Sequence, residues 1–245
     1  MRSLCSYLGM LCISAPLYAA PTLTIALGET KMPYVSAETQ SGIEYDITKQ
    51  ALNLAGYQVK IDFLPNKRAQ LKLQEGQLDA AIGNTGQYLS DPYIAYQNMA
   101  ITLCKRQILI NSVPELAAFQ VAAFHNANQY LGAEFAKIAS NKSNYRELSP
   151  QQLMNRMLLA AHIDVAISDI NIFKHEHEIL DPSANHTLCP FAIFPPTKYH
   201  LAFRDPSARD RFNVALKTLR EQGFYEQLAK KYGMPLDHHQ PYFKP

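Results

Sequence analysis

Hydrophobic positions follow two different rhythms along the chain, and these rhythms predict strands and helices in turn. Residues 22–27 and 57–63 alternate apolar and polar side chains, which is typical of strands. Residues 42–56 place apolar side chains three and four positions apart and end at a glycine, which predicts a helix. By the same criteria we predict further strands at 79–83, 119–124, 163–167 and 198–203, and further helices at 67–75, 126–139, 150–161, 205–222 and 224–232.

Local residue chemistry predicts where two of these helices begin. Asn66 is a suitable N-cap for the helix 67–75, which Gly76 closes. Ser149 is a suitable N-cap with Pro150 at the first helical position, opening the helix that ends near Ala161.

The order of elements predicts the fold class, because strands and helices alternate twice over. Such an order favours an α/β protein with mainly parallel sheets and helices on both faces. Residues 99–110 are apolar and extended, long enough to leave a first lobe, and the strand near 200 returns to it. No low-complexity linker separates the halves, so we expect two lobes joined by two crossover strands.

Composition narrows the class of partner. The chain has 245 residues, of which 47% are hydrophobic and 18% charged, so it can build one large or two small cores. Its 23 basic and 21 acidic residues nearly cancel, and no basic run occurs. We therefore expect no nucleic-acid partner.

The first twenty residues differ from the rest. Arg2 precedes an apolar stretch from Leu4 to Leu17, and Ala19 and Ala20 follow. This pattern is typical of a secretory signal peptide (1–20), and the stretch is short for a membrane anchor. We expect cleavage after Ala19 or Ala20 and a periplasmic protein.

Export would leave two of the four cysteines, Cys104 and Cys189. In an oxidising compartment these thiols either pair in a disulfide or stay reduced as small buried hydrophobes. Both alternatives are open from the sequence.

Six short motifs follow one another along roughly residues 22–233. They are Pro33-Tyr34, Gly42-Ile43-Glu44-Tyr45-Asp46-Ile47, Leu73-x-x-Gly76-x-x-Asp79-Ala80-Ala81, Ser90-Asp91-Pro92-Tyr93, Ile163-Asp164-Val165-Ala166-Ile167-Ser168-Asp169, and Phe212-Asn213-x-Ala215-Leu216 with Gly223-Phe224-Tyr225 and Lys231-Tyr232. Together, and in this order, they resemble the periplasmic solute-binding proteins of the polar amino acid type, family 3.

The resemblance implies a two-lobed type II periplasmic-binding fold that closes on a small ligand. Lobe one would comprise residues 22–103 and 197–245, and lobe two residues 104–196. Ligands in such sheets bind at the carboxyl ends of strands. The implied protein is a monomer that captures a small polar ligand for an ABC permease of the inner membrane.

The resemblance also assigns candidate ligand contacts, each with a structural alternative. Asp169 would pair with a ligand ammonium, or cap the helix after it. Tyr34 would form an aromatic wall, or pack in the core. At the other corners we take Asn84, Thr85, Gly86, His125 and Asn126 as contacts, against a tight turn at 84–86, a solvated His125 and a helix cap at Asn126. Glu44 and Asp46 open a helix, where acids favour its dipole.

One departure concerns the ligand. The family carries a Thr-x-x-Arg segment after the third strand, whose arginine clamps the α-carboxylate of an amino acid. Between Gly83 and Ser90 this chain has no arginine. We propose Arg68 as a substitute, with a solvated surface residue as the alternative.

Catalytic motifs give no positive support for an enzyme. The chain lacks nucleophile-elbow and nucleotide-binding glycine motifs, and His175-Glu176-His177 lacks zinc-site spacing. We expect no cofactor and no metal. The alternatives are an enzyme on the same fold, similar to cyclohexadienyl dehydratases, and a ligand-sensing module for a membrane receptor.

Overall fold

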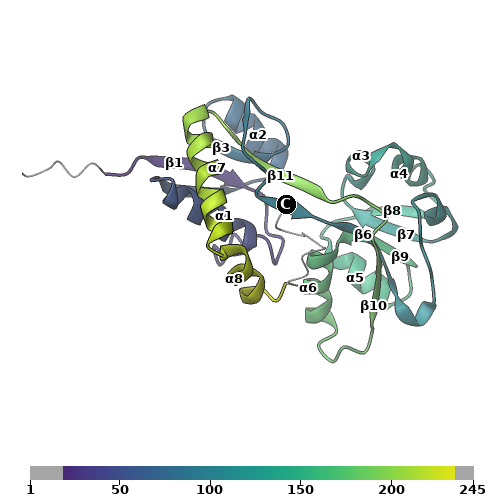
Figure 1. The fold of residues 1–245 in the computed structure, drawn as a ribbon. Helices are drawn as coiled ribbons and strands as arrows, with labels where there is room; N and C mark the ends of the chain where they lie inside the picture. The colour runs from purple at the N-terminus through teal and green to yellow at the C-terminus, as the bar shows by residue number, and fades with distance from the viewer. Residues whose placement is uncertain (1–18, 235–245) are drawn as a thin grey trace, which may run out of the picture.

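The computed structural model describes residues 19–234, so the predicted signal segment lies almost wholly outside the described residues. Two lobes lie side by side, and each is built on one sheet (Figure 1). Within residues 19–234, none of the helices is long and apolar enough to cross a bilayer.

The first lobe contains a six-stranded sheet in the order β2-β1-β3-β11-β4, with β5 paired to β11. Strand β1 pairs in parallel with β2 and β3, whereas β11 runs antiparallel to its neighbours. The strands are β1 (Thr22–Leu27), β2 (Gln58–Phe63), β3 (Ala80–Gly83), β4 (Tyr88–Leu89), β5 (Ile94–Tyr96) and β11 (Thr197–Phe203).

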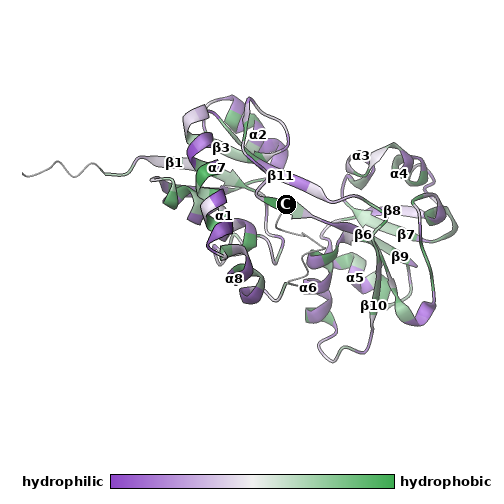
Figure 2. Ribbon diagram, viewed as in Figure 1, coloured by the Kyte–Doolittle hydropathy of each residue, from purple (hydrophilic) through white to green (hydrophobic). Residues whose placement is uncertain are grey.

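Amphipathic helices cover this sheet. Ile43, Ile47 and Ala51 of α1 are fully buried, which accounts for the helical spacing seen in the sequence. In Figure 2, α7 and α8 change between hydrophobic and hydrophilic residues along their length, as helices packed on one side do. The helices are α1 (Ile43–Leu54), α2 (Asn66–Gln74), α7 (Pro206–Glu221) and α8 (Phe224–Lys231).

The second lobe contains a five-stranded sheet in the order β10-β6-β9-β7-β8. Its strands are β6 (Asn98–Leu103), β7 (Val121–Phe124), β8 (Tyr145–Leu148), β9 (Val165–Asp169) and β10 (Leu188–Phe191). Its helices are α3 (Ala127–Tyr130), α4 (Gly132–Ala139), α5 (Gln152–Leu159) and α6 (Ile170–Leu180), with 3-10 turns at Cys104–Arg106 and Pro114–Ala118.

Both sheets are mixed rather than mainly parallel, which corrects our prediction of their strand directions. In lobe two, β7 pairs in parallel with β8 and β9, while β6 runs antiparallel to β9 and β10. The strand that enters each lobe from the other, β11 or β6, therefore joins it antiparallel. The α/β class and the two-lobed architecture are confirmed.

Strand β6 belongs to the second sheet, although we placed residues up to 103 in lobe one. The chain passes between the sheets at Gln97. Its side-chain Nε2 donates to the carbonyl of Phe194 in the returning segment, at 2.7 Å. This bond ties the two crossover segments together.

Three of the predicted helix boundaries are wrong. Helix α2 begins at Asn66, so Pro65 is its N-cap and no side chain caps it. The bond before Pro150 is cis, and α5 begins only at Gln152. The predicted helix 126–139 divides at Gly132, whose φ of 89° favours glycine.

The extended stretch predicted at 99–110 ends early, because β6 stops at Leu103 and a 3-10 turn follows. Cys104 begins that turn and forms a disulfide with Cys189 of β10. The pairing alternative for the two cysteines is therefore the one the structure bears out. The bridge joins residues 85 positions apart.

Candidate functional site

The carboxyl ends of parallel strands bring the predicted site residues to one edge of each sheet. In lobe one, the loop after β1 carries Tyr34, the corner after β2 carries Arg68, and Asn84 follows β3. In lobe two, His125 follows β7 and Asp169 ends β9. Open α/β sheets bind their ligands at such edges.

Asp169 connects the two edges and caps a helix at the same time. Its Oδ1 accepts hydrogen bonds from the backbone N–H groups of Asn171 and Ile172, at 2.9 and 3.1 Å. Its Oδ2 accepts from the hydroxyl of Tyr34 at 3.2 Å and from the N–H of Gln97 at 2.8 Å. The predicted helix cap is confirmed, and the side chain is only 3% exposed.

The burial of Asp169 decides its ionisation. Removal from water disfavours the carboxylate and raises its pKa to about 6, although four hydrogen-bond donors act in the opposite direction. Burial, and then the neighbouring Asp169 carboxylate, raise the pKa of the Tyr34 hydroxyl well above its usual value. Tyr34 is therefore a permanent donor to Asp169 at neutral pH.

Tyr34 is held in place by the backbone at the start of α1. Its carbonyl accepts from the N–H of Glu44 at 2.9 Å. Gly42 lies against the same carbonyl with φ 121°, and a Cβ there would come within 2.2 Å of its oxygen. Only glycine fits, because both the conformation and the space exclude a side chain. This contact gives a physical reason for the glycine that opens the family-like motif.

Three tyrosine rings form a column that leads out of the core. The rings of Tyr34 and Tyr96 stack with centroids 4.1 Å apart, and Tyr199 tilts against Tyr96 at 4.8 Å. Tyr130 of α3 is 61% exposed and interacts electrostatically with Tyr199. Burial, with Glu44 and Asp169 nearby, raises the pKa of Tyr199 to about 12. Tyr34 itself is fully buried, which matches the core-packing alternative.

Glu44 anchors this column from the first turn of α1. It is fully buried, and its two carboxylate oxygens accept hydrogen bonds from Tyr93 at 2.7 Å and Tyr96 at 2.6 Å. Lys31 Nζ lies 3.8 Å from Glu44 and 5.1 Å from the centre of the Tyr96 ring. The structural role expected of Glu44 is thus supported, through tyrosine hydroxyls in addition to the helix dipole.

Lys31 is a site residue that we did not predict. It belongs to the loop after β1, and its Nζ lies over Gly28, where a Cβ would be 2.6 Å away. Asn66 Oδ1 would lie 3.3 Å from that Cβ of Gly28, so the first turn of α2 adjoins Lys31. Arg68, exposed in that turn, occupies the corner at which we placed it. The feature of the sequence that could have pointed to Lys31 is its position, a single cation four residues after the end of β1.

The remaining predicted contacts line the two edges with little burial. Asn84, Thr85 and Gly86 are exposed, and His125 is exposed with its Nδ1 4.0 Å from Glu147. Asn126 takes the N-cap position of α3 with a left-handed φ of 64°, and no side chain caps that helix. Its backbone N–H donates to Glu147 at 2.8 Å. Their roles as ligand contacts stay predictions.

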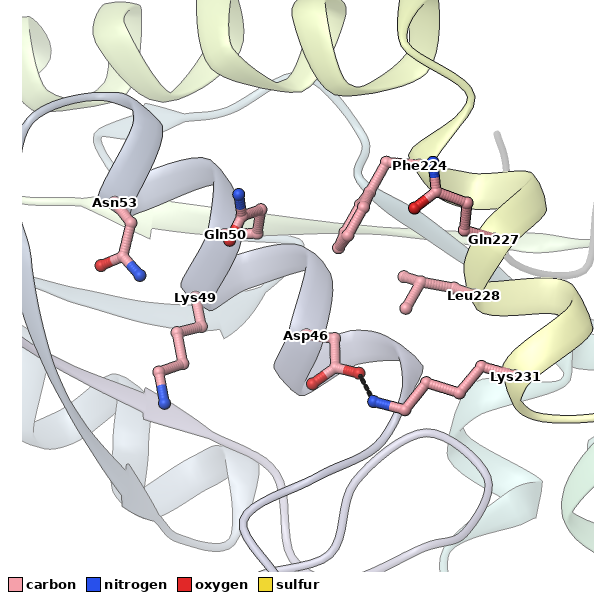
Figure 3. Close-up of a pocket in the computed structure, with 8 residues that line it drawn as sticks. All are labelled: Asp46, Lys49, Gln50, Asn53, Phe224, Gln227, Leu228 and Lys231. Atoms are coloured by element: carbon pink, nitrogen blue, oxygen red, sulfur yellow. Dashed lines mark hydrogen bonds and ion pairs between the residues drawn. The ribbon is translucent and has the colours of Figure 1, made fainter.

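A hollow of about 330 Å³ lies away from these residues, between α1 and α8 (Figure 3). Phe224 and Leu228 point into it, and the Asp46–Lys231 ion pair of 2.7 Å closes one side. None of its lining residues is a predicted ligand contact.

Among residues 19–234, no three His, Cys, Asp or Glu side chains gather where they could hold a metal ion. His177 is 8% exposed, and its Nε2 lies 2.9 Å from the carbonyl oxygen of His186.

The fold places the chain among two-lobed α/β proteins of the type II periplasmic-binding fold. The GluR0 ligand-binding core in complex with L-glutamate aligns with 88% of this chain and 99% of its own, at TM-score 0.69 and 15% identity. A histidine kinase sensor domain with similarity to periplasmic binding proteins aligns over 87% and 96%, at TM-score 0.67 and 16% identity.

A third similar structure is the arginine-, lysine-, histidine-binding protein ArtJ from Geobacillus stearothermophilus. It covers 86% of this chain and 94% of its own length, at TM-score 0.64 and 16% identity. No family model and no curated protein matches the sequence. At these identities the likeness confirms the predicted fold, and the resemblance read from the motifs is confirmed at that level.

Proposed function

We propose that this protein binds a small polar ligand between its two lobes and, after export, delivers it to an ABC permease of the inner membrane. The observation that carries the proposal is the Tyr34–Asp169 hydrogen bond. It joins the two sheet edges at which the strands have their carboxyl ends, beside the crossover at Gln97. Closure of lobes about such crossovers is a common means of enclosing a ligand. Similar solved structures are binding proteins for amino acids.

Export is supported by a separate observation. Cys104 and Cys189 are joined in a disulfide, and such bonds persist mainly outside the reducing cytosol. The apolar segment 4–17 with its small residues at 19 and 20 supports cleavage and a periplasmic location.

Binding itself can be tested without knowing the ligand. Thermal unfolding of the exported protein is measured against amino acids, small peptides, polyamines and organic acids. A ligand at one hundred times its Kd stabilises by about 2.7 kcal/mol. For a chain of this size that is a rise in Tm of roughly 5–10 °C. Absence of any shift across all four classes would contradict the proposal.

Sensing is the second candidate, because a histidine kinase sensor domain is among the similar structures. The two functions share the binding step and differ in what receives the closed protein. Deleting the gene would abolish uptake of the radiolabelled ligand if the protein serves transport. It would leave uptake intact and abolish a transcriptional response if the protein serves sensing. In neither case do we propose bond-making chemistry.

A further inference from the structure

The acidic group that would hold a ligand ammonium is already saturated by the protein. An ionised carboxylate offers about four acceptor positions. In Asp169 all four are used: Asn171 and Ile172 donate to Oδ1, and Tyr34 and Gln97 donate to Oδ2. Asn171 Nδ2 also donates to the Tyr34 hydroxyl at 3.0 Å, which holds that hydroxyl in place. A ligand ammonium would have to displace one of these donors from Asp169, which is only 3% exposed.

Glu44 and Glu147, two further acids near the edges, are similarly engaged. Glu44 is fully buried and accepts from Tyr93 and Tyr96. Glu147 accepts from the N–H groups of Asn126 and Asn128 and from the Tyr145 hydroxyl, at 2.8, 3.2 and 2.9 Å. The exposed carboxylate at the lobe-one edge is Glu29, next to Gly28.

Cations at the lobe-one edge, in contrast, keep free donors. Lys67 and Arg68 are exposed in the first turn of α2, which contains no acidic residue. Within residues 19–234 neither side chain has a hydrogen-bond or ion-pair partner. A helix N-terminus carries partial positive charge, so these cations are unfavourable there unless an anion is bound. Lys31, which pairs with Glu44 at 3.8 Å, places a further ammonium group near Asn66.

We infer that the ligand of this site is a small organic acid that presents a carboxylate and carries no ammonium group. The inference rests on the proposed function, because it names the class of ligand for the same site. The α2 cations would bind the carboxylate, Arg68 with two parallel hydrogen bonds. The half-buried ring of Tyr199 and the exposed ring of Tyr130 supply apolar surface for the rest of the molecule.

The test compares pairs of compounds that differ only in the α-ammonium group. The pairs are L-glutamate with glutarate, L-leucine with 4-methylpentanoate, and L-phenylalanine with 3-phenylpropanoate. Affinities of the exported protein are measured by calorimetric titration at pH 7.5. We expect the ammonium-free acid of at least one pair to bind at least about tenfold more tightly than its amino acid. A tenfold difference corresponds to about 1.4 kcal/mol.

Two exposed variants then test which charges are recognised. Lys67→Gln combined with Arg68→Gln should weaken binding of that acid at least about tenfold. The matched control is Lys72→Gln, in the last turn of the same helix, which should change affinity less than about twofold. Circular dichroism melts confirm that each variant is folded.

Each outcome bears on a different statement. Tighter binding of the amino acid in every pair that binds overturns the inference and leaves the proposed function standing. No binding by any of the six compounds overturns the inference, and the wider ligand panel then decides the proposed function. An acid that binds the double variant and the wild type equally also overturns it, because the charge of α2 would then play no part.

Discussion

The hydroxyl of Tyr34 donates a 3.2 Å hydrogen bond to Oδ2 of Asp169, across 135 residues of sequence. The bond joins the loop after β1 in lobe one to the last residue of β9 in lobe two. The same hydroxyl accepts from Asn171 Nδ2 at 3.0 Å. One oxygen atom thus satisfies two buried polar groups at the junction of the lobes.

Replacing Tyr34 by Phe should therefore destabilise the protein. Both buried partners lose their hydrogen bond, and a buried unsatisfied group costs roughly 1–3 kcal/mol. Urea unfolding measures the loss. The control is Tyr88→Phe, whose hydroxyl accepts only from the exposed Gln87 side chain and whose loss should cost less than about 0.5 kcal/mol. Equal stabilities of the two variants would contradict the buried arrangement.

Asp169 should give stability an unusual dependence on pH. Its pKa is about 6 in the folded protein against an ordinary 3.8, so between these values the folded state binds more protons than the unfolded state. The contribution of Asp169 to stability is then fully present below pH 4 and declines until about pH 6. The decline amounts to as much as about 3 kcal/mol, at 1.36 kcal/mol for each pKa unit.

The Asp169→Asn variant isolates this effect. Asparagine does not titrate, so its altered hydrogen bonds shift stability by an amount independent of pH. Urea unfolding from pH 4 to 7.5 should show wild-type stability falling relative to the variant until about pH 6 and then running parallel to it. A constant difference over the whole range would show that Asp169 is ionised with an ordinary pKa.

The two acids in the first turn of α1 should differ in their effect on stability. Glu44 is fully buried between two tyrosine hydroxyls, so Glu44→Gln should cost about 1.5–3 kcal/mol, the range for hydrogen bonds to a charged group. Asp46 pairs with Lys231, whose side chain is 56% exposed, and accepts from the Tyr232 hydroxyl at 2.8 Å. Asparagine keeps an oxygen acceptor for that hydroxyl, so Asp46→Asn should cost about 0–1 kcal/mol. Chemical denaturation of both variants checks the order, and a larger loss for Asp46→Asn would refute it.

Loss of the Cys104–Cys189 disulfide should lower stability by about 2–5 kcal/mol, because an unlinked chain has more conformations available when unfolded. Unfolding midpoints are compared with and without reductant. The Cys104→Ser/Cys189→Ser variant should match the reduced protein and respond to reductant no further. Free thiols detected in the unreduced, denatured exported protein, beyond those of any retained leader, would argue against the bridge.

Cleavage of the leader is checked by mass. We expect the exported protein to begin at Ala20 or Pro21, the residues that follow the two small positions of the cleavage pattern. Electrospray mass spectrometry of the intact protein distinguishes these two products from the uncleaved chain. A mass that includes residue 1 would show that the segment is retained.

Regular elements were predictable where local interactions decide them. The alternation at 22–27 gave the bounds of β1, and the helical spacing at 42–56 gave α1 within two residues at each end. Asp169 as a helix cap was equally local, because its oxygen reaches N–H groups only two and three residues ahead. The helix starts predicted at Asn66 and Pro150 were wrong. Both residue types are common at helix starts, but α2 begins one residue earlier than predicted and α5 begins two residues later.

The sequence by itself determined the longer strands and helices and their order, the two-lobed α/β class and the corners at which the site residues lie, whereas the short strands β4, β5, β8 and β10 were not predicted. Spacing between neighbours along the chain encodes these features. Only the tertiary structure decided that Tyr34 and Gln97 saturate Asp169, and that Lys31 lies beside Glu44 and Asn66. Such partners are set by how separate loops meet when the lobes pack, and no periodicity along the chain records which residues will meet.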